Sequence, residues 1–339
     1  EFVNEHAAPM GLRTLLLAVA GINLSTFCFQ RAFLHGRSLR PLKFRWSQTK
    51  KLVMKRTRES DNDESGPPRM AKDAACAERV QSAWRADPRL QGIGPFASEA
   101  LVYQDEEGSR RLHGRLVRPA APNGAGVVVV HTAVGPRDLY LHWRAEVLAA
   151  GGYTVLIADL LGDEYGQGWE PEWNSKAREP LNDRALSRKR MQASVAALAA
   201  VEGVDPKRIA AIGYCFGGRT VLDLARAGSF AGISAAVSFH GILDDGVIAS
   251  EDMSHPDAPQ VLICHGDADP FISAENRAAC EEQLRRCKAR WDMLVLGGVR
   301  HGFTNPAQAL NPNPAFGYSA RAASVSWKAA EDLLAESLR

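Results

Sequence analysis

The stretch at residues 208–220 reads Arg-Ile-Ala-Ala-Ile-Gly-Tyr-Cys-Phe-Gly-Gly-Arg-Thr. Gly213 and Gly217 flank Cys215 two positions away on each side, which is the spacing of a sharp strand-to-helix turn that presents a nucleophile. Such a turn strains the backbone of its central residue, and it leaves no room for a Cβ atom at the flanking positions. The pattern predicts Cys215 as a nucleophile. The backbone N–H of Phe216 would face an oxyanion, and the N-terminus of the following helix would favour a thiolate.

A buried structural cysteine beside a glycine-rich turn would give a similar local pattern, because free cysteines are commonly buried. The context of Cys215 favours the catalytic interpretation. A short apolar run, typical of a buried strand, ends at Gly213, and a helix-compatible run begins at Thr220.

Short apolar runs alternate with helix-compatible segments through the rest of the chain. A predicted antiparallel hairpin at 101–103 and 112–117 comes first. The other predicted strands are 127–130, 154–158, 234–239, 261–264 and 293–296, and the predicted helices are 71–86, 138–150, 182–202, 273–290 and 319–338. This alternation predicts an α/β fold with a mostly parallel central sheet and helices on both faces. No Gly-x-Gly-x-x-Gly opens a helix, so the sequence does not predict a dinucleotide site.

The hexapeptide Gly213-Tyr214-Cys215-Phe216-Gly217-Gly218 resembles the nucleophile turn of the dienelactone hydrolase family. That family is a branch of the α/β-hydrolases that uses Cys, Asp and His. The resemblance runs from about Glu99 to the C-terminus. It implies the α/β-hydrolase fold and hydrolysis of a carboxylic ester or lactone, of the carboxymethylenebutenolidase type, with neither a metal nor an organic cofactor.

The catalytic acid is expected after a later strand, because α/β-hydrolases place nucleophile, acid and histidine in that order along the chain. The strand predicted at 261–264 is followed by the run His265-Gly266-Asp267-Ala268-Asp269. The family pattern places the acid three residues after the glycine, which implies Asp269. Asp267 would then be a turn-forming residue.

The histidine is expected in the loop after the last predicted strand. There the run 297–303, Gly-Gly-Val-Arg-His-Gly-Phe, resembles the family's Gly-x-x-His-x-Phe. The resemblance implies that His301 is the base that takes the proton of the thiol. His265 and His240 also follow predicted strands, and both could instead form hydrogen bonds within the loop layer.

The loop after the strand at 127–130 is the expected source of a second oxyanion donor. By resemblance, the backbone N–H of Ala133 pairs with that of Phe216. Characterised members of the family carry a glutamate in this loop, where the present chain has Thr132. Threonine cannot accept a proton from the thiol at neutral pH. A direct ion pair between Cys215 and His301 is therefore the expected means of activation.

The family's substrates carry a carboxylate that arginines hold. One of these arginines lies four residues beyond the histidine, where this chain has Asn305. A second is expected within 180–190, where Arg184, Arg188 and Arg190 are candidates, although a solvated helix face explains them equally well. Loss of one arginine weakens carboxylate recognition, so a neutral or differently shaped ester, lactone or thioester is an equal candidate substrate.

The segment 163–181 is expected over the mouth of the pocket, where Trp169 and Trp173 could line an apolar acyl site. Ordinary packing of a long loop explains them as well. The residues predicted to line the substrate pocket are Thr132, Trp169 and Asn305.

Charge is unevenly distributed along the 339 residues, although the formal net charge is only +2. The segment from His6 to Arg58 holds eleven Lys or Arg residues and no Asp or Glu, and the remainder is acidic. A nucleic-acid-binding function is therefore not predicted for the main domain. The six cysteines contain no Cys-x-x-Cys pair, so neither a disulfide framework nor a zinc site is expected.

The N-terminal region is predicted to precede the folded domain. Residues 1–58 are basic and free of acids after His6, like an organelle-targeting sequence for a plastid or mitochondrion. The alternative is untranslated or disordered sequence ahead of a later start at Met54 or Met70, in a cytoplasmic protein. The predicted organisation is a leader and linker at 1–70, a short helical lead-in at 71–96 and the hydrolase domain at 97–339. No apolar run is long enough to predict a membrane span.

The sequence thus predicts a hydrolase with Cys215 as nucleophile, His301 as base and Asp269 as orienting acid. The expected partner is a small ester or lactone, and the sequence leaves open whether the protein is a monomer or a dimer. Two other functions stay open: a thioesterase or other acyl hydrolase, and a non-catalytic module of the same fold that binds a ligand. A redox-sensing thiol is a weaker option that needs Cys264 close to Cys215.

Overall fold

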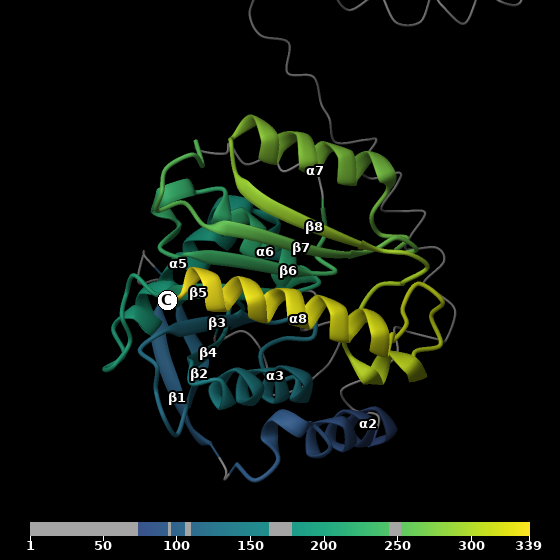
Figure 1. Ribbon diagram of the computed structural model, residues 1–339, viewed down its shortest axis with the longest axis horizontal. Coiled ribbons are helices and arrows are strands. Elements are labelled where there is room, and N and C mark those ends of the chain that lie inside the picture. The colour runs from purple at the N-terminus through teal and green to yellow at the C-terminus, as the bar shows by residue number, and fades with distance from the viewer. Residues whose placement is uncertain (1–73, 94–95, 106–109, 163–177, 244–251) are drawn as a thin grey trace, which may run out of the picture. The chain divides into compact units, whose positions relative to one another are not determined.

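The computed structural model of the protein describes residues 74–93, 96–105, 110–162, 178–243 and 252–339 (Figure 1). All of them belong to one compact unit, Ser65–Arg339. The predicted leader at 1–70 lies outside the described residues, as do Trp169 and Trp173.

An eight-stranded sheet forms the centre of the described unit, in the order β1-β2-β4-β3-β5-β6-β7-β8. The strands are β1 (Ala97–Gln104), β2 (Arg111–Arg118), β3 (Gly126–Val130), β4 (Thr154–Ala158), β5 (Ile209–Tyr214), β6 (Ala235–Phe239), β7 (Gln260–Gly266) and β8 (Arg290–Leu296). The β1–β2 and β2–β4 pairs are antiparallel, and every later pair is parallel. The predicted hairpin and the predicted mostly parallel sheet are both confirmed.

Helices cover both faces of the sheet (Figure 1). They are α2 (Ala74–Arg85), α3 (Leu139–Ala150), α5 (Arg184–Ala199), α6 (Phe216–Ala225), α7 (Ala274–Arg286) and α8 (Ala320–Ser337), with short 3-10 turns at η2 (Pro88–Leu90), η3 (Glu179–Asn182), η4 (Gly228–Ala231) and η5 (Pro306–Leu310). Side chains of α2, α3 and α8 join one apolar cluster, and those of α5, α6 and α7 join the other.

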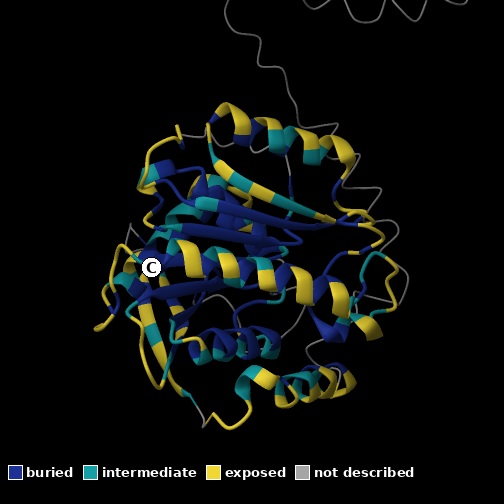
Figure 2. Ribbon diagram, viewed as in Figure 1, coloured by how far each residue is buried: buried dark blue, intermediate teal, exposed yellow. Residues whose placement is uncertain are grey.

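The strand β3 shows how the sequence produces these two layers. Val127 and Val129 point into the cluster under α3 and α8, whereas Val128 and Val130 point into the cluster under α5 and α6. Successive side chains of a strand leave opposite faces, so a strand buried on both sides is an unbroken apolar run. Figure 2 shows these central strands as buried and the outer surfaces of α7 and α8 as largely exposed.

Two helices are shorter than the sequence predicts. The predicted helix 182–202 begins at Arg184, because the Asp183 side chain accepts hydrogen bonds from the first free N–H groups and caps the helix. The predicted helix 273–290 ends at Arg286, because Lys288 has a φ of 58°, a left-handed conformation that ends a helix.

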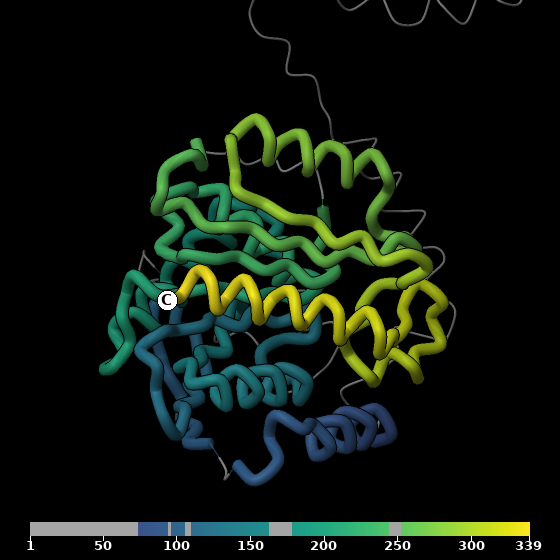
Figure 3. Tube along the Cα trace, in the orientation of Figure 1, coloured from purple at the N-terminus to yellow at the C-terminus, as the bar shows by residue number. Residues whose placement is uncertain are grey.

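The parallel strands place the carboxyl ends of β5, β6, β7 and β8 at one edge of the sheet, as the chain trace shows (Figure 3). Ligands of open α/β sheets bind at this edge. None of the helices in the described ranges is long and apolar enough to cross a lipid bilayer.

Candidate active site

Cys215 occupies the sharp turn between β5 and α6 with φ 54° and ψ −113°, a strained conformation for a residue that carries a side chain. Glycine is required on both sides of Cys215 because a Cβ atom there would have no space. A Cβ atom on Gly217 would lie 2.5 Å from the Val130 carbonyl oxygen, and one on Gly213 would collide with the backbone of Gly217. The glycine spacing therefore reflects close backbone contact at the turn.

His301 and Asp269 lie next to this turn although they follow different strands. Nδ1 of His301 is 2.6 Å from Oδ2 of Asp269, and both side chains are almost wholly buried. Asp267, the competing aspartate, is exposed. The Asp269 carboxylate also accepts a hydrogen bond from the Phe271 N–H at 3.0 Å. The structure therefore places Asp269 within hydrogen-bonding distance of the imidazole ring, where a carboxylate can orient it.

The loop that carries His301 is held by its own backbone. The His301 N–H donates to the Ala315 carbonyl, and its carbonyl accepts from the Gly317 N–H, both at 3.1 Å. The rings of Phe271 and Phe316 meet the imidazole edge-on, with centroids 5.0 Å and 5.3 Å away. Backbone and ring contacts together restrict the orientation of His301.

The thiol of Cys215 is more acidic than an ordinary cysteine. Burial raises its pKa, but the charge and hydrogen bond of His301 lower it, and so do hydrogen bonds from two backbone N–H groups. The net effect is a lowered pKa. For His301, burial lowers the pKa, but the Cys215 thiolate and the Asp269 carboxylate raise it by more, and the net shift is upward. These opposite shifts favour a thiolate–imidazolium pair.

The two N–H groups on the sulfur belong to Phe216 and Ala133. Phe216 begins α6, and Ala133 lies in the loop after β3. The structure therefore brings together the two predicted oxyanion donors, one from the start of α6 and one from the loop after β3, beside the predicted nucleophile. Donors in this arrangement can also stabilise negative charge on the oxygen of a bound carbonyl.

The side chains of two predicted pocket residues are engaged within their own loops. The Thr132 hydroxyl accepts a hydrogen bond from the Val134 N–H at 3.1 Å. The Asn305 side chain accepts from the Ala307 N–H at 2.9 Å and so caps η5. Their role in binding substrate stays a prediction, as does that of Trp169, which lies outside the described residues.

The charge of Arg178 interacts with that of Cys215, although no pattern in the sequence predicts this arginine as part of the site. Burial lowers the pKa of its guanidinium, and the charge of Cys215 opposes that shift. Two arginines that the sequence offered are engaged elsewhere. Arg184 forms an ion pair with the buried Asp223, and Arg190 donates to the Leu160 carbonyl at 2.6 Å. Arg178 immediately precedes η3, in a segment without periodicity, so no local pattern marks it.

A metal site is not evident in the described part of the chain, where no group of three His, Cys, Asp or Glu side chains could hold an ion.

The fold and the nucleophile turn together define an α/β-hydrolase. A family model described as the dienelactone hydrolase family matches residues 112–338, and the chain belongs to that family. A solved structure of a dienelactone hydrolase-like promiscuous phosphotriesterase from metagenomic libraries is 34% identical. The two structures superpose with a TM-score of 0.64, and the match covers 73% of this chain and 100% of the phosphotriesterase chain.

Two relatives extend the comparison. An uncharacterised protein of Caenorhabditis elegans is 35% identical over 147 residues, which is 43% of this chain and 91% of the relative. A probable 2-oxo-3-(5-oxofuran-2-ylidene)propanoate lactonase of Bradyrhizobium is 25% identical over 199 residues, covering 56% of this chain and 77% of the relative. The family and its fold are therefore established, and the activity is that of a dienelactone hydrolase-like hydrolase.

Proposed function

We propose that the protein hydrolyses a carboxylic ester or lactone through an acyl-cysteine intermediate formed on Cys215. The observation that carries this proposal is the line from the Cys215 thiol through His301 to Asp269, with two backbone N–H groups directed at the sulfur. An inert buried cysteine has no need of an imidazole, an orienting carboxylate and two donors around one atom.

In the first half of the reaction, the Cys215 thiolate attacks the carbonyl carbon. The C=O electron pair moves to the oxygen, which the Phe216 and Ala133 N–H groups stabilise. The tetrahedral intermediate collapses, the C–O bond to the leaving group breaks, and the imidazolium of His301 gives its proton to the departing alkoxide. The products are an acyl-cysteine, a neutral imidazole and an alcohol. In a lactone, the alcohol stays attached to the acyl group.

In the second half, neutral His301 takes a proton from water as the water attacks the acyl-cysteine. The C–S bond breaks, the carboxylic acid leaves, and the thiolate–imidazolium pair forms again. Asp269 holds Nδ1 of the ring throughout, so that the other ring nitrogen can exchange protons with both the leaving group and the water.

Arg178 is the proposed contact for an acidic group on the substrate. With Asn305 at the position where the family carries an arginine, this chain lacks one cation of the pair that the resemblance implies, and Arg178 would supply the other. We therefore expect a preference for carboxylated substrates that is weaker than a pair of arginines would give. The relative with a lactonase name makes lactones the first class to test, and the promiscuous phosphotriesterase adds phosphotriesters as a second class.

Two alternatives compete with this proposal. A thioesterase would use the same residues on an acyl thioester, and only a comparison of substrates separates the two. A ligand-binding module without catalysis would keep the fold, and Thr132 in place of the family's glutamate favours that option. A binding module has no need of a thiolate, so an ordinary pKa for Cys215 would favour it.

The deciding experiment compares the full chain with Cys215→Ala on p-nitrophenyl acetate, dihydrocoumarin, dienelactone, an acyl thioester and paraoxon. We expect activity on at least one ester or lactone, and a loss of about 10⁴-fold in the variant. Cys264→Ala is the matched control, because it removes another cysteine of the same sheet. Equal activity of wild type and Cys215→Ala, or none on any substrate, would overturn the proposal.

A further inference from the structure

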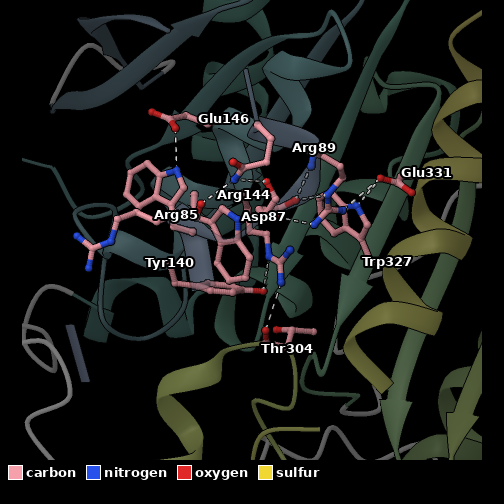
Figure 4. Close-up of polar contacts among 12 residues, drawn as sticks. Arg85, Asp87, Arg89, Tyr140, Arg144, Glu146, Thr304, Trp327 and Glu331 are labelled. Carbon is pink, nitrogen blue, oxygen red and sulfur yellow. Dashed lines mark hydrogen bonds and ion pairs between the residues drawn. The ribbon is translucent and has the colours of Figure 1, made fainter. Parts of the chain in front are cut away.

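A guanidinium group is buried behind the candidate active site. Arg144 of α3 is only 4% exposed, and no carboxylate of the described residues forms an ion pair with it. Aromatic rings surround it instead (Figure 4). Its Cζ lies 4.1 Å from the ring centroid of Trp143, 4.9 Å from that of Trp327 and 5.0 Å from that of Tyr140. Cation–π contacts of this kind hold a desolvated guanidinium in place.

The helical lead-in packs against this aromatic cage, which consists of Tyr140, Trp143 and Trp327. Asp87, just before η2, accepts a hydrogen bond from Nε1 of Trp143 at 2.9 Å and pairs with Arg89 at 2.7 Å. The Arg89 guanidinium in turn lies 5.3 Å from the ring centroid of Trp327. Figure 4 shows Asp87, Arg89 and Trp327 grouped beside Arg144. The lead-in thus fixes two of the three rings.

Arg144 extends from the cage toward the loop that carries His301. Its Nη2 donates to the backbone carbonyl of Thr304 at 3.3 Å. The hydroxyl of Thr304 shares a hydrogen bond of 2.9 Å with Nε2 of His240. Thr304 is 3% exposed, so water does not compete for either bond. One residue of the loop therefore joins the guanidinium to a second histidine.

His240 lies against His301. Their ring centroids are 5.1 Å apart and the planes are inclined by 66°. Burial and the positive charge of His301 both lower the pKa of His240 well below its ordinary value, so this ring is neutral. His240 follows β6 with a φ of 40°, which is rare for a residue with a side chain. Such a conformation persists only where the surroundings hold it.

We propose that Arg144, Thr304 and His240 form a buried positioning array that holds the His301 ring at the angle at which it pairs with Cys215. The three are linked to one another and to the His301 ring by the contacts above, so the proposal assigns them as positioning residues and not as catalytic ones. The proposal rests on the proposed function, because it assigns a role relative to the Cys215–His301 pair.

The geometry gives a reason for this role. Asp269 fixes Nδ1 of His301, but that hydrogen bond alone would still allow the ring to swing about the contact and away from Cys215. Phe271 and Phe316 limit the swing through ring contacts, and His240 limits it through another. His240 can do so only if it is itself fixed, and the Thr304 hydroxyl fixes it. Small errors in the position of a catalytic group cost large factors in rate.

The test is Thr304→Val in the full chain, which removes the hydroxyl and keeps both the side-chain volume and the backbone carbonyl. With p-nitrophenyl acetate as substrate, we expect kcat to fall about tenfold while KM changes by less than about twofold. The rate of Cys215 alkylation by iodoacetamide, followed against pH, gives a readout without any substrate. A misplaced imidazolium stabilises the thiolate less, so the midpoint should rise by about half a pH unit.

Thr304→Ser restores the hydroxyl and should return both readouts to wild type. Ser326→Ala is the matched control, because it removes another buried hydroxyl hydrogen bond, to the Ala322 carbonyl at 2.7 Å. It should change neither readout. If Thr304→Val does not fold, Arg144→Lys takes its place, since it keeps the charge but weakens the hold on the Thr304 carbonyl.

The outcomes separate the two proposals. Wild-type kcat and an unmoved midpoint in a folded Thr304→Val, or in Arg144→Lys where that replaces it, would overturn the positioning array alone. Equal effects in Ser326→Ala would overturn it too, because general loosening would then explain the result. An ordinary thiol midpoint in the wild type would overturn the proposed function, and the array with it.

Discussion

Cys215 follows β5, and Cys264 lies two strands away in β7. The pKa values of their thiols are shifted in opposite directions. Burial raises the pKa of Cys264, inside β7, to about 12. Cys215 is half-buried, and burial also raises its pKa, yet the imidazole of His301 and two backbone N–H groups outweigh burial and lower it. Residue type is the same at both positions. Reactivity therefore depends on the groups gathered where β5 leaves the sheet.

The register of the sheet also shows whether these two cysteines are close enough to form a disulfide. Tyr214, Phe239 and Cys264 lie level with one another on β5, β6 and β7. Neighbouring strands are about 4.8 Å apart, so the two cysteine Cα atoms are separated by roughly 10 Å. A disulfide needs a Cα separation of about 4.4–6.8 Å. The geometry therefore argues against Cys264 as a resolving thiol for Cys215.

Among the substitutions that test this comparison, Asp269→Asn is expected to have the largest effect. An amide cannot hold the imidazolium as a carboxylate does, so the Cys215 environment should become more like that of Cys264. We expect kcat/KM for p-nitrophenyl acetate to fall about 10³-fold. Asp267→Asn is the matched control, since it changes an exposed aspartate two residues away, and it should retain wild-type activity. A larger loss in Asp267→Asn would reassign the acid.

Selective alkylation measures the difference in reactivity between the two thiols directly. At pH 7 iodoacetamide should modify Cys215 at least about a hundredfold faster than Cys264, because thiolate is the reacting species. The pKa of Cys215 is lowered, so its thiolate fraction should persist as pH falls below the ordinary thiol range and should disappear only below the lowered pKa. Peptide mass spectrometry across pH 4–9 would measure both rates. Equal rates at the two cysteines would remove the basis for a catalytic Cys215.

A smaller effect is expected from Arg178→Gln. This substitution removes a cation whose charge interacts with Cys215, whereas the pKa of Cys264 is raised by burial. We expect KM for a carboxylated ester to rise about tenfold, while KM for a neutral ester stays within about twofold. Arg188→Gln is the matched control, because Arg188 is the remaining candidate in the 180–190 segment. An equal rise for both esters would show that Arg178 does not read the substrate's charge.

Local patterns in the sequence were enough to predict the sheet, and they named the residues that the structure brings together after β5. Apolar runs mark strands buried on both faces, and the glycines around Cys215 follow from backbone contacts that leave no space for a Cβ atom. The acid and the histidine were placed through the order of residues along the chain and a family pattern. The structure brings Asp269 and His301 together, although 32 residues separate them.

Contacts between distant segments were not predictable in this way. Arg144 and Thr304 are 160 positions apart, and His240 and Thr304 are 64 apart. An arginine within an apolar helix gives no sign of the rings that will surround it, and His240 had only a general assignment to the loop layer. Arg178 lies just outside the 180–190 segment in which the resemblance predicts an arginine, because an irregular stretch has no period from which to count positions.

The smallest expected effect is that of Cys264→Ala, which tests the inert member of the pair. Cys264 is wholly buried in β7 between β6 and β8, so loss of its sulfur leaves a small cavity that should cost about 1 kcal/mol of unfolding free energy. Thermal unfolding should show a decrease in Tm of about 3 °C. Because burial is the cause of the raised pKa of this thiol, and not a contact with the Cys215–His301 pair, kcat/KM for p-nitrophenyl acetate and the alkylation midpoint of Cys215 should both stay at wild-type values. A loss of activity well beyond the loss of stability would mean that Cys264 supports the site through β7, since Asp269 follows that strand. The reactivity of Cys215 would then depend on Cys264, and the difference between the two thiols could no longer be attributed only to the groups next to each sulfur.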